Sequence, residues 1–518
     1  MPNLSPDIPS GVRLAELMGA LSIATDLGMG QPLEFALHSC VVALRLGEQL
    51  GLDVQDLRAV YYQSLLRYIG CNFETRLLAA VFGDELLLRK DFIHVDTTSF
   101  DFFRQMTAAI RSSHETLPPV QVLWSITRGF VEAARFSKEF YESHCEIAER
   151  LAERLGFETT IATAIKQVYA RWDGKGVPNI KGEAIAPGML IVSLAQDAVY
   201  AFQLGGTDAA LNLVRQRKGS LYAPKHVEVF SHHAEELLAG SDLNWAGVMD
   251  LEPGVHKVLS ESEFDTACEV IADFTDLKSP YLLGHSPGVA RVALSVARQF
   301  GLPEADILQI RRVGLLHDIG RVGVSAGIWG KQTPLSERDW EAIRLHPYHT
   351  ERILARSPVL NAIGQIASMH HERLDGSGYH RGATSPILKS MARIVAVADV
   401  YQALTEPRPY RPALSAEEAS IVVVNEARAN RLDGDVVNSL LAAVGQLPSP
   451  RKIFPGGLSE REVEVVRLVA RGQSIKEIAQ SLTITPKTAD SHIQHIYNKI
   501  GVNTRAGATL YALENRLL

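Results

Sequence analysis

Cysteine, long apolar runs and excess positive charge are all scarce in this sequence. The 518 residues include only 4 cysteines, and no two of them have a CxxC spacing, which excludes a disulfide-rich scaffold and a cysteine-ligated zinc knuckle. No run reaches the roughly 18–20 uncharged apolar residues of a membrane span, and MPNLSPDIPS at 1–10 lacks the basic and apolar regions of a signal peptide. The net charge of −7 opposes a chain-wide affinity for nucleic acid, so any DNA binding must be local. We therefore expect a cytoplasmic protein with reduced cysteines and no membrane contact.

The stretch GLLHDIGRVG at 314–323 places two ionisable residues directly after an apolar pair. His317 and Asp318 follow Leu315 and Leu316. A buried charge without a partner is expensive, so both side chains need partners if this helix is buried. A metal ion would satisfy both groups, whereas a helix cap or a surface position is the alternative for an isolated His-Asp pair. Further ligands are needed to decide between these interpretations.

The surrounding segments supply such ligands. Apolar residues recur with helical spacing in five segments, which cover 285–300, 304–317, 337–356, 358–371 and 388–404. Each predicted helix carries one or two imidazole or carboxylate groups. The seven candidate ligands are His285, His317, Asp318, His346, His370, His371 and Asp399. Groups in this order can converge at the centre of a helical bundle, as metal ligands do in such folds.

From His285 to about Leu447 the chain resembles the HD-GYP branch of the HD phosphohydrolase superfamily. Besides the candidate ligands, the shared motifs are HDIG at 317–320, DGSGY at 375–379, IVAVADVYQALT at 394–405 and RPYRPAL at 408–414. The resemblance implies an all-helical fold, a centre of two iron or two manganese ions, and hydrolysis of cyclic di-GMP. It also implies that the seven candidates bind the metals and that Asp318 bridges them.

The expected chemistry gives roles to nearby residues as well. Two divalent ions about 3.5–4 Å apart can hold a phosphate and lower the pKa of a water towards about 7. Arg321 can then neutralise a phosphate oxygen, while Arg408 and Arg411 can hold a second phosphate; the alternative for each arginine is a solvated helix end. We therefore predict catalytic roles for Asp318 and Arg321. The predicted substrate-binding residues are Gly378, Tyr379, Arg408 and Arg411.

Three residues depart from the family pattern. Arg321 stands where the family usually has a lysine, and His380 stands where it has the proline of Gly-Tyr-Pro. Arginine keeps the charge but not the compact shape, and the missing proline frees a backbone angle in the loop that shapes the family's substrate pocket. Tyr281 occupies a position where some members carry a glutamate for a third metal, so we expect two metals. One alternative is a catalytically silent metal-stabilised scaffold.

The first half of the chain reads as a faded copy of the second. Residues 36–52 parallel 283–302 with His38 opposite His285, and SLLRYIGC at 64–71 parallels GLLHDIGR at 314–321 with Arg67 and Tyr68 opposite the His-Asp pair. The remaining counterparts are His144, Val168 with Tyr169, and Asp197 in the segment 191–202. Without the His-Asp pair, this copy is expected to bind no pair of metals.

The last residues, 457–518, strongly resemble the LuxR-type (GerE) helix-turn-helix, which has four helices and reads DNA with the third. Thr485 can cap that helix, and Pro486 suits its first position. Lys487, Thr488, His492 and Lys499 are expected to contact phosphates, and Ser491 and Gln494 to face base edges. Such tails commonly dimerise through the fourth helix, so we expect a homodimer on double-stranded DNA; a tail used for protein association is the alternative.

Together these features predict an all-α protein made of tandem HD-superfamily bundles, the first degenerate, and a C-terminal helix-turn-helix. The predicted boundaries are 1–240 for the first bundle with an insertion near 74–135, 241–258 for a connector, 259–447 for the metal-binding bundle, 448–456 for a linker and 457–518 for the DNA-binding domain. The predicted function is a transcriptional regulator that hydrolyses or senses a cyclic dinucleotide, with cyclic di-GMP favoured. The alternative is a DNA-binding regulator or sensor of another ligand.

Overall fold

The computed structural model describes residues 11–73, 84–92 and 141–446, most of 455–517, and a few positions between these ranges. Within this part of the chain all regular elements are helices and only isolated β-bridges occur, which confirms the predicted all-α class. The chain forms two compact units, 1–446 and 447–518. No helix in the described part combines the length and the apolar character needed to cross a membrane. Most of the predicted insertion and linker lies outside the described residues.

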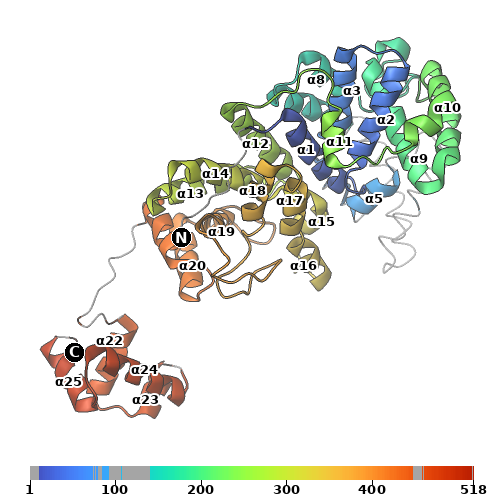
Figure 1. The fold of residues 1–518 in the computed structure, drawn as a ribbon. Coiled ribbons are helices and arrows are strands. Elements are labelled where there is room, and N and C mark those ends of the chain that lie inside the picture. Colours follow the sequence, from blue (N-terminus) through green and yellow to red (C-terminus); the bar gives the residue numbers. More distant parts are fainter. Residues whose placement is uncertain are drawn as a thin grey trace. The chain divides into compact units, whose positions relative to one another are not determined.

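The first half of the larger unit is a helical bundle (Figure 1). Its elements are α1 (Leu14–Gly28), α2 (Phe35–Gln49), α3 (Val54–Leu66), α5 (Glu85–Phe92), α8 (Thr159–Ile165), the short 3-10 helix η1 (Gly182–Ala184), α9 (Pro187–Gln216) and α10 (Pro224–Leu238). Residues 141–154 are also helical. The short helix α11 (Trp245–Asp250) follows, and it lies within the predicted connector.

The second half of the larger unit is also a helical bundle, and it contains more helices than the first half. They are α12 (Glu261–Asp276), α13 (His285–Phe300), α14 (Glu304–Leu316), η2 (Ile319–Gly323), α15 (Ala326–Trp329), α16 (Glu337–Arg344), α17 (His346–Leu354), α18 (Pro358–Ala367), α19 (Ser390–Leu404), α20 (Ala416–Arg428) and α21 (Gly434–Ala443). The helix expected over 337–356 is interrupted at Leu345, because Pro347 fits only the first turn of a new helix. The helix expected over 358–371 already ends at Ala367, so the paired histidines follow it.

Equivalent hydrogen bonds relate the two halves. Asp26 accepts from the backbone N–H of Ala36 at 3.1 Å, and Asp276 accepts from that of Ser286 at 2.9 Å. Each acceptor lies ten residues before the second residue of the following helix. The residue opposite His285 is therefore Phe35, and the alignment with His38 was wrong by one turn. Such a slip is easy, because apolar positions in an amphipathic helix recur every three or four residues.

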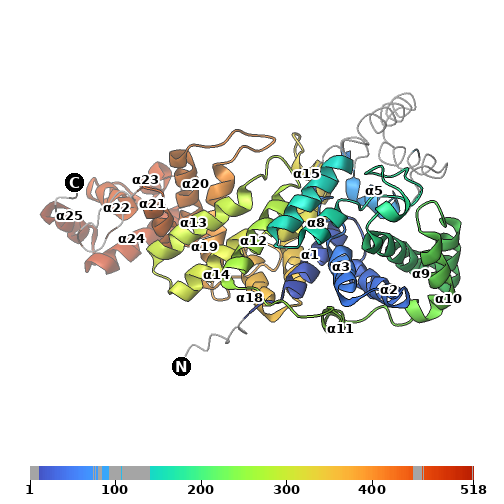
Figure 2. The same cartoon turned by 90° about the horizontal axis from the view of Figure 1, so that it is seen from above.

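The two halves share one hydrophobic core. A continuous cluster of buried apolar side chains extends from Val12 in the first half to Leu441 in the second. Figures 1 and 2 show the helices of both halves packed side by side, with α1 and α5 beside the second half. The second half is therefore not a separate domain, and side chains of the first half contact it directly.

The smaller unit contains α22 (Glu460–Ala470), α23 (Ile475–Leu482), α24 (Pro486–Ile500) and α25 (Arg505–Glu514) around its own apolar core. The hydroxyl of Thr485 accepts from the N–H of Thr488 at 3.2 Å, and Pro486 opens α24. Gly501 ends that helix with a left-handed backbone at φ 71°. These four helices and this cap agree with the sequence prediction.

Candidate metal centre

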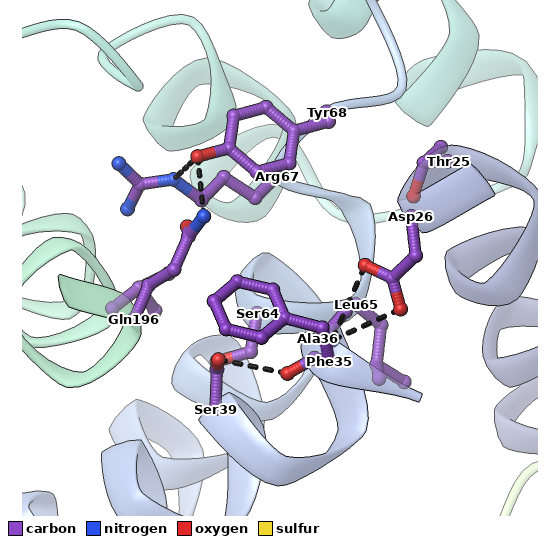
Figure 3. A pocket seen from close by; sticks show the side chains of 11 residues that line it. Thr25, Asp26, Phe35, Ala36, Ser39, Ser64, Leu65, Arg67, Tyr68 and Gln196 are labelled. Carbon is purple, nitrogen blue, oxygen red and sulfur yellow. Dashed lines mark hydrogen bonds between the residues drawn. The ribbon is translucent and has the colours of Figure 1, made fainter. Parts of the chain in front are cut away.

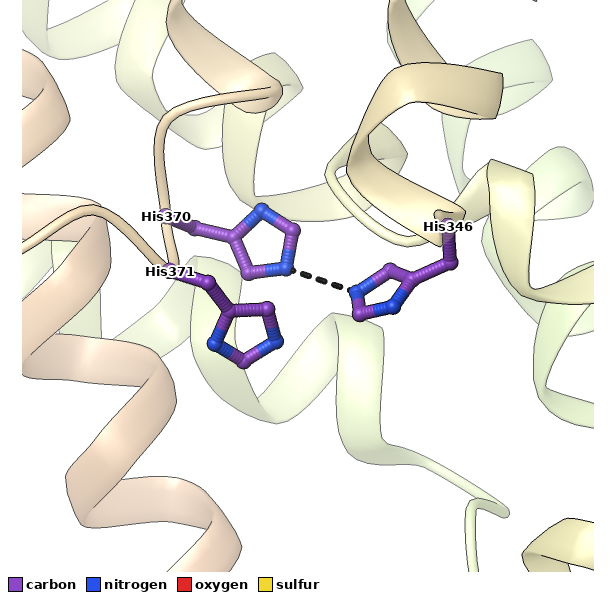
Figure 4. Close-up of side chains that lie close together, drawn as sticks. All are labelled: His346, His370 and His371. Carbon is purple, nitrogen blue, oxygen red and sulfur yellow. Dashed lines mark hydrogen bonds between the residues drawn. The ribbon is translucent and has the colours of Figure 1, made fainter. Parts of the chain in front are cut away.

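Helix ends bring the seven candidate ligands together. His285 opens α13, His346 opens α17, and Asp399 lies inside α19. His317 and Asp318 directly follow α14, and His370 and His371 come shortly after α18. All except His371 are buried, and Figure 4 shows His346, His370 and His371 with their rings gathered from two segments. The structure thus brings all seven predicted ligands into one site.

The ligands fall into two groups, one for each expected metal. His285, His317, Asp318 and Asp399 form the first group, and within it the candidate ligand atoms lie within 4.8 Å of one another. The second group contains His346, His370 and His371, with the same limit on the distances. Among the described residues, both groups of this kind lie in the second half.

Asp318 lies between the two groups. Its Oδ2 is 2.9 Å from Nε2 of His317 and 3.4 Å from Nε2 of His285. Its Oδ1 is 3.3 Å from Nε2 of His346 and 3.4 Å from Nε2 of His370. One carboxylate oxygen therefore faces each group, which is the arrangement that a bridging ligand requires.

The opposite ring nitrogens of the histidines are already bonded. Nδ1 of His317 lies 2.8 Å from the carbonyl of Gly314, Nδ1 of His346 lies 2.6 Å from that of Ile343, and Nδ1 of His370 lies 2.7 Å from that of Ala367. A carbonyl can only accept, so each Nδ1 carries a proton and Nε2 is the ring nitrogen that is left to bind a metal. Outer hydrogen bonds of this kind orient metal-binding histidines.

The residues present fit a metal centre. Nε2 of His346 and Nε2 of His370 lie 3.1 Å apart, so two lone pairs face each other unless a cation lies between them. Nε2 of His285 and of His317 and both oxygens of Asp318 are buried without a hydrogen-bond partner among the described atoms. Mixed imidazole and carboxylate ligands suit divalent iron or manganese.

Burial and neighbouring charges shift the pKa values of His346 and His285, one from each group, in opposite directions. Burial lowers the pKa of His346 to about 4, and Asp318 offsets this only in part. Burial and the charge of Arg321 act in the same direction on His285, but the nearby carboxylates of Asp318, Asp399 and Glu406 outweigh them and raise the pKa of His285 to about 10. Although burial opposes ionisation, Arg321 and His317 hold the pKa of Asp318 well below its usual range. The carboxylates stay ionised, as metal binding requires.

Two glycines allow the loops to approach the site closely. A side chain on Gly320 would collide with the carbonyl oxygen of His346, and one on Gly378 would collide with the backbone of Glu372 and Arg373. The ring of Tyr379 lies 4.7 Å from that of His371 and 6.4 Å from that of His346, measured between centroids. The predicted substrate-loop residues Gly378 and Tyr379 therefore lie beside the second group of histidines.

Arg321 is positioned next to the bridging carboxylate. Its Nη1 lies 2.8 Å from Oδ2 of Asp318, and the residue is 5% exposed. Its guanidinium lies over the ring of Trp329, 5.2 Å from the centroid, and its buried Nε has no hydrogen-bond partner in the described part of the chain. A fixed, partly unsatisfied cation at this place suits a phosphate oxygen.

The two other predicted phosphate ligands differ from each other. Arg408 donates to the carbonyl of Tyr281 at 2.8 Å and pairs with Glu406 at 3.0 Å. Glu406 also contacts Nδ1 of His285 at 2.8 Å, so the guanidinium of Arg408 lies near the site, and burial together with the charge of Arg321 lowers its pKa. Arg411 instead donates to the carbonyls of Ala403, Leu404, Glu406 and Pro412. Its side chain closes the end of α19, and a role in substrate binding stays a prediction.

The corresponding place in the first half has different chemistry. Nε of Arg67 donates to the hydroxyl of Tyr68 at 3.1 Å, and Gln196 donates to the same hydroxyl at 2.5 Å (Figure 3). Asp197, opposite Asp399, pairs with Arg217 and accepts from the hydroxyl of Tyr222. Protein cations and hydroxyls thus take the place of metal ions beside the retained carboxylate.

Two residues near the metal centre escaped the sequence prediction. Glu406 lies 2.8 Å from Nδ1 of His285, and it stands two residues after the end of α19, the helix that carries Asp399. Trp329 covers Arg321 and lies 5.9 Å from the ring of His346 between centroids. An acidic residue so soon after the helix of Asp399 could have indicated Glu406, whereas nothing in the sequence near Trp329 indicated its position.

The predicted DNA-contacting residues share one exposed surface of α24. Lys487, Thr488, Ser491, His492, Gln494 and Lys499 are all exposed, while Ala489, Ile493 and Ile496 are buried in the core of the unit. Nζ of Lys499 pairs with Glu462 at 2.8 Å, which offsets part of its charge. A phosphate would therefore have to compete with Glu462 for Lys499.

Comparisons with known proteins agree with the geometry. Residues 269–436 match the HD domain family, and residues 457–512 match the family of bacterial regulatory proteins of the luxR type. The 3'3'-cGAMP-specific phosphodiesterase 3 of Vibrio cholerae is 31% identical over 455 residues, which cover 85% of this chain and 97% of that protein. A crystal structure of a cyclic GMP-AMP specific phosphodiesterase of V. cholerae covers 85% of this chain and 99% of its own, with a TM-score of 0.58 and 27% identity.

A cyclic di-GMP phosphodiesterase of Thermotoga maritima is 36% identical over 137 residues, which cover 26% of this chain and 37% of that protein. The same family is indicated by the long match to the Vibrio protein, by the HD domain match and by the buried ligand set. The chain belongs to the HD family of metal-dependent phosphohydrolases, in its HD-GYP branch, and carries a luxR-type regulatory domain near its C-terminus.

Proposed function

We propose that the second half hydrolyses a cyclic dinucleotide at a centre of two divalent metal ions. The observation that carries the proposal is the position of Asp318, with one oxygen facing His285 and His317 and the other facing His346 and His370. Bound there, iron or manganese supplies Lewis acidity and a water of lowered pKa. Asp318 and Asp399 supply the negative charge that holds the cations.

Protein side chains provide the remaining roles. The guanidinium of Arg321 balances charge that develops on a phosphate oxygen, because it is fixed beside Asp318 and against the ring of Trp329. Tyr379 presents a ring beside His371, where it can contact the substrate. Arg408 pairs with Glu406, which lies 2.8 Å from Nδ1 of His285, and at this place it can bind a second phosphate, which a cyclic dinucleotide provides.

Two substrates have support from relatives. The Vibrio relative that matches most of this chain is named for 3'3'-cGAMP, and the shorter Thermotoga match is named for cyclic di-GMP. We favour 3'3'-cGAMP, because that match spans both halves. The tail adds a second proposed role: it binds double-stranded DNA as a homodimer, so the protein acts as a cytoplasmic regulator.

The test combines metal content with turnover. The full chain is loaded with manganese or iron under reducing conditions, and hydrolysis of 3'3'-cGAMP and of cyclic di-GMP is followed by chromatography. We expect two metals per chain, and Asp318→Ala should lose both the metals and the hydrolysis. Asp197→Ala in the first half is the matched control and should keep both. Two bound metals in Asp318→Ala would refute the bridging role, and hydrolysis of neither nucleotide by the loaded protein would refute the proposed activity.

A further inference from the structure

A buried ion pair joins the first half to the second half close to the metal centre. Oε1 of Glu85, in α5, lies 2.8 Å from Nζ of Lys278, which follows α12, and both side chains are fully buried. Figures 1 and 2 show α5 next to α15 at the border between the halves. A buried pair is rarely a net gain in stability, so its contacts are of more interest than its energy.

Both members of the pair hold the segment that follows Arg321. Nζ of Lys278 donates to the carbonyl of Val322 at 3.1 Å. Glu85 accepts from the hydroxyl of Ser325 at 2.7 Å and from the backbone N–H of Ala326 at 2.8 Å. The pair therefore fixes both ends of residues 322–326, which begin directly after Arg321.

The carboxylate of Glu85 also fixes the short helix whose tryptophan covers Arg321. Ala326 is the first residue of α15, and Trp329 is the last. Trp329 covers the guanidinium of Arg321, so Glu85 holds the start of the helix that presents this ring, while its partner Lys278 holds the start of the backbone segment. Burial raises the pKa of Glu85, but Lys278, Ala326 and Ser325 outweigh it and keep the pKa below its usual value. Burial lowers the pKa of Lys278, and Glu85 offsets this in part.

Other side chains of the first half strengthen this attachment. Asn72 donates to the carbonyl of Phe274 at 2.6 Å, and Thr75 donates to the carbonyl of Lys278 at 3.1 Å. Leu27 packs so closely on Gly323 that a side chain on that glycine would collide with it. The first half thus contacts residues shortly before His285 and shortly after Asp318 without supplying any of the seven candidate metal ligands.

We propose that Glu85 is a positioning residue by which the first half fixes Arg321 for phosphate binding in the second half. The inference rests on the proposed catalytic role of Arg321. It gives the degenerate copy a function of its own: it has no complete set of metal ligands in the described residues, but it completes the active site of its neighbour. A displacement of about 1 Å at a catalytic group can reduce a rate by a factor on the order of 100.

The test uses the full chain loaded with manganese and 3'3'-cGAMP as substrate. Glu85→Gln removes the charge but keeps the shape, and we expect it to lower kcat by a factor of about 10 to 100 with the metal content unchanged. Glu252→Gln is the matched control, because Glu252 is also a fully buried carboxylate, paired with Arg13 and Arg58 away from the metal centre. It should destabilise the protein without lowering kcat. An equal loss of kcat in both variants at equal thermal stability would overturn the proposal.

A double substitution separates positioning from general damage. If Glu85 acts through Arg321, then Glu85→Gln should cause no further loss of kcat in an Arg321→Ala background, whereas independent roles would give multiplied losses and refute the proposal. If Arg321→Ala alone leaves kcat unchanged, the catalytic role of Arg321 fails instead. Hydrogen exchange over 322–329 then tests Glu85 by itself: faster exchange in Glu85→Gln upholds its hold on the segment, and unchanged exchange overturns it.

Discussion

Nδ1 of His285 lies 2.8 Å from a carboxylate oxygen of Glu406, which also pairs with Arg408 at 3.0 Å. His285 differs in this respect from His317, His346 and His370, whose Nδ1 atoms donate to backbone carbonyls. An ionised acceptor makes the imidazole a stronger ligand than a neutral carbonyl does. Glu406 therefore connects the metal centre to the arginine that is predicted to bind substrate.

Replacing Glu406 by Ala should weaken metal binding by a factor of about 10 to 100, because His285 loses the group that orients it. A competition titration with a chromophoric chelator measures this change. Glu426→Ala provides the control, since Glu426 pairs with Arg431 in the same half but touches no ligand. Unchanged affinity in the Glu406 variant would mean that helix α13 alone fixes His285.

Replacing Arg321 by Ala should lower kcat by a factor of about 100 to 1000, as the loss of a charge-stabilising donor does. Arg321→Lys should recover only part of the loss, because an ammonium group cannot lie flat over Trp329 while it contacts Asp318. Steady-state kinetics with the manganese-loaded protein measure both effects. Full activity in the lysine variant would show that charge alone is sufficient.

His144 offers a pH-dependent test of the first half, where it corresponds to His346. Burial and the charge of Arg89 lower its pKa from 6.5 to about 3. Between these values the unfolded chain binds a proton that the folded chain does not, so stability is complete above about pH 6.5 and falls as the pH drops towards 3. In His144→Asn, denaturation at pH 7 and pH 5 should show a smaller loss of stability on acidification.

The same variant tests whether the first half contributes to metal binding. Metal content should be unchanged in His144→Asn, because Arg67 and Tyr68 occupy the positions of the His-Asp pair. His346→Asn, its counterpart in the second half, should lose metal. The loss of a full metal equivalent in the His144 variant would require a second functional site.

Contacts between residues that are close along the chain could be predicted from the sequence, and contacts between distant residues could not. The seven ligands were predictable, because each lies at the end or on the buried side of a helix with a clear apolar pattern. The counterpart of His285 was misplaced by one turn, because the helical pattern tolerates that shift. The contact of Glu85 with Ser325 joins residues 240 positions apart, and no local pattern records a contact of that kind.

The exposed surface of α24 predicts two different effects of substitution on DNA binding. Lys487→Ala should weaken binding to every sequence and reduce the slope of log K against log salt by about 1, since it removes one phosphate contact. Gln494→Ala should change the preferred sequence, with an effect of about 1–3 kcal/mol at the affected base pair. Anisotropy titrations over a range of salt concentrations measure both.

Lys225→Ala serves as the control for charge, because Lys225 is exposed in the larger unit and should leave the salt slope unchanged. If the Lys487 variant keeps the wild-type salt slope, Lys487 does not contact a phosphate. If the Gln494 variant keeps the wild-type sequence preference, Gln494 does not recognise a base.

Nucleotide at the metal centre should alter the affinity for DNA. A dimeric DNA-binding protein must place its two recognition helices about one DNA turn apart. Leu510 and Leu513 on α25 are 56% and 59% exposed, as a dimer contact requires. The larger unit is joined covalently to the DNA-binding unit of the same chain. A ligand that changes how two larger units associate therefore changes the spacing of the two recognition helices. We expect a coupling energy on the order of 1–3 kcal/mol. DNA titrations with and without saturating 3'3'-cGAMP measure it, with Asp318→Ala used to suppress turnover once its nucleotide binding is established. Leu510→Ser should reduce both dimerisation and the coupling, whereas equal DNA affinities with and without nucleotide would leave an enzyme with an independent DNA anchor.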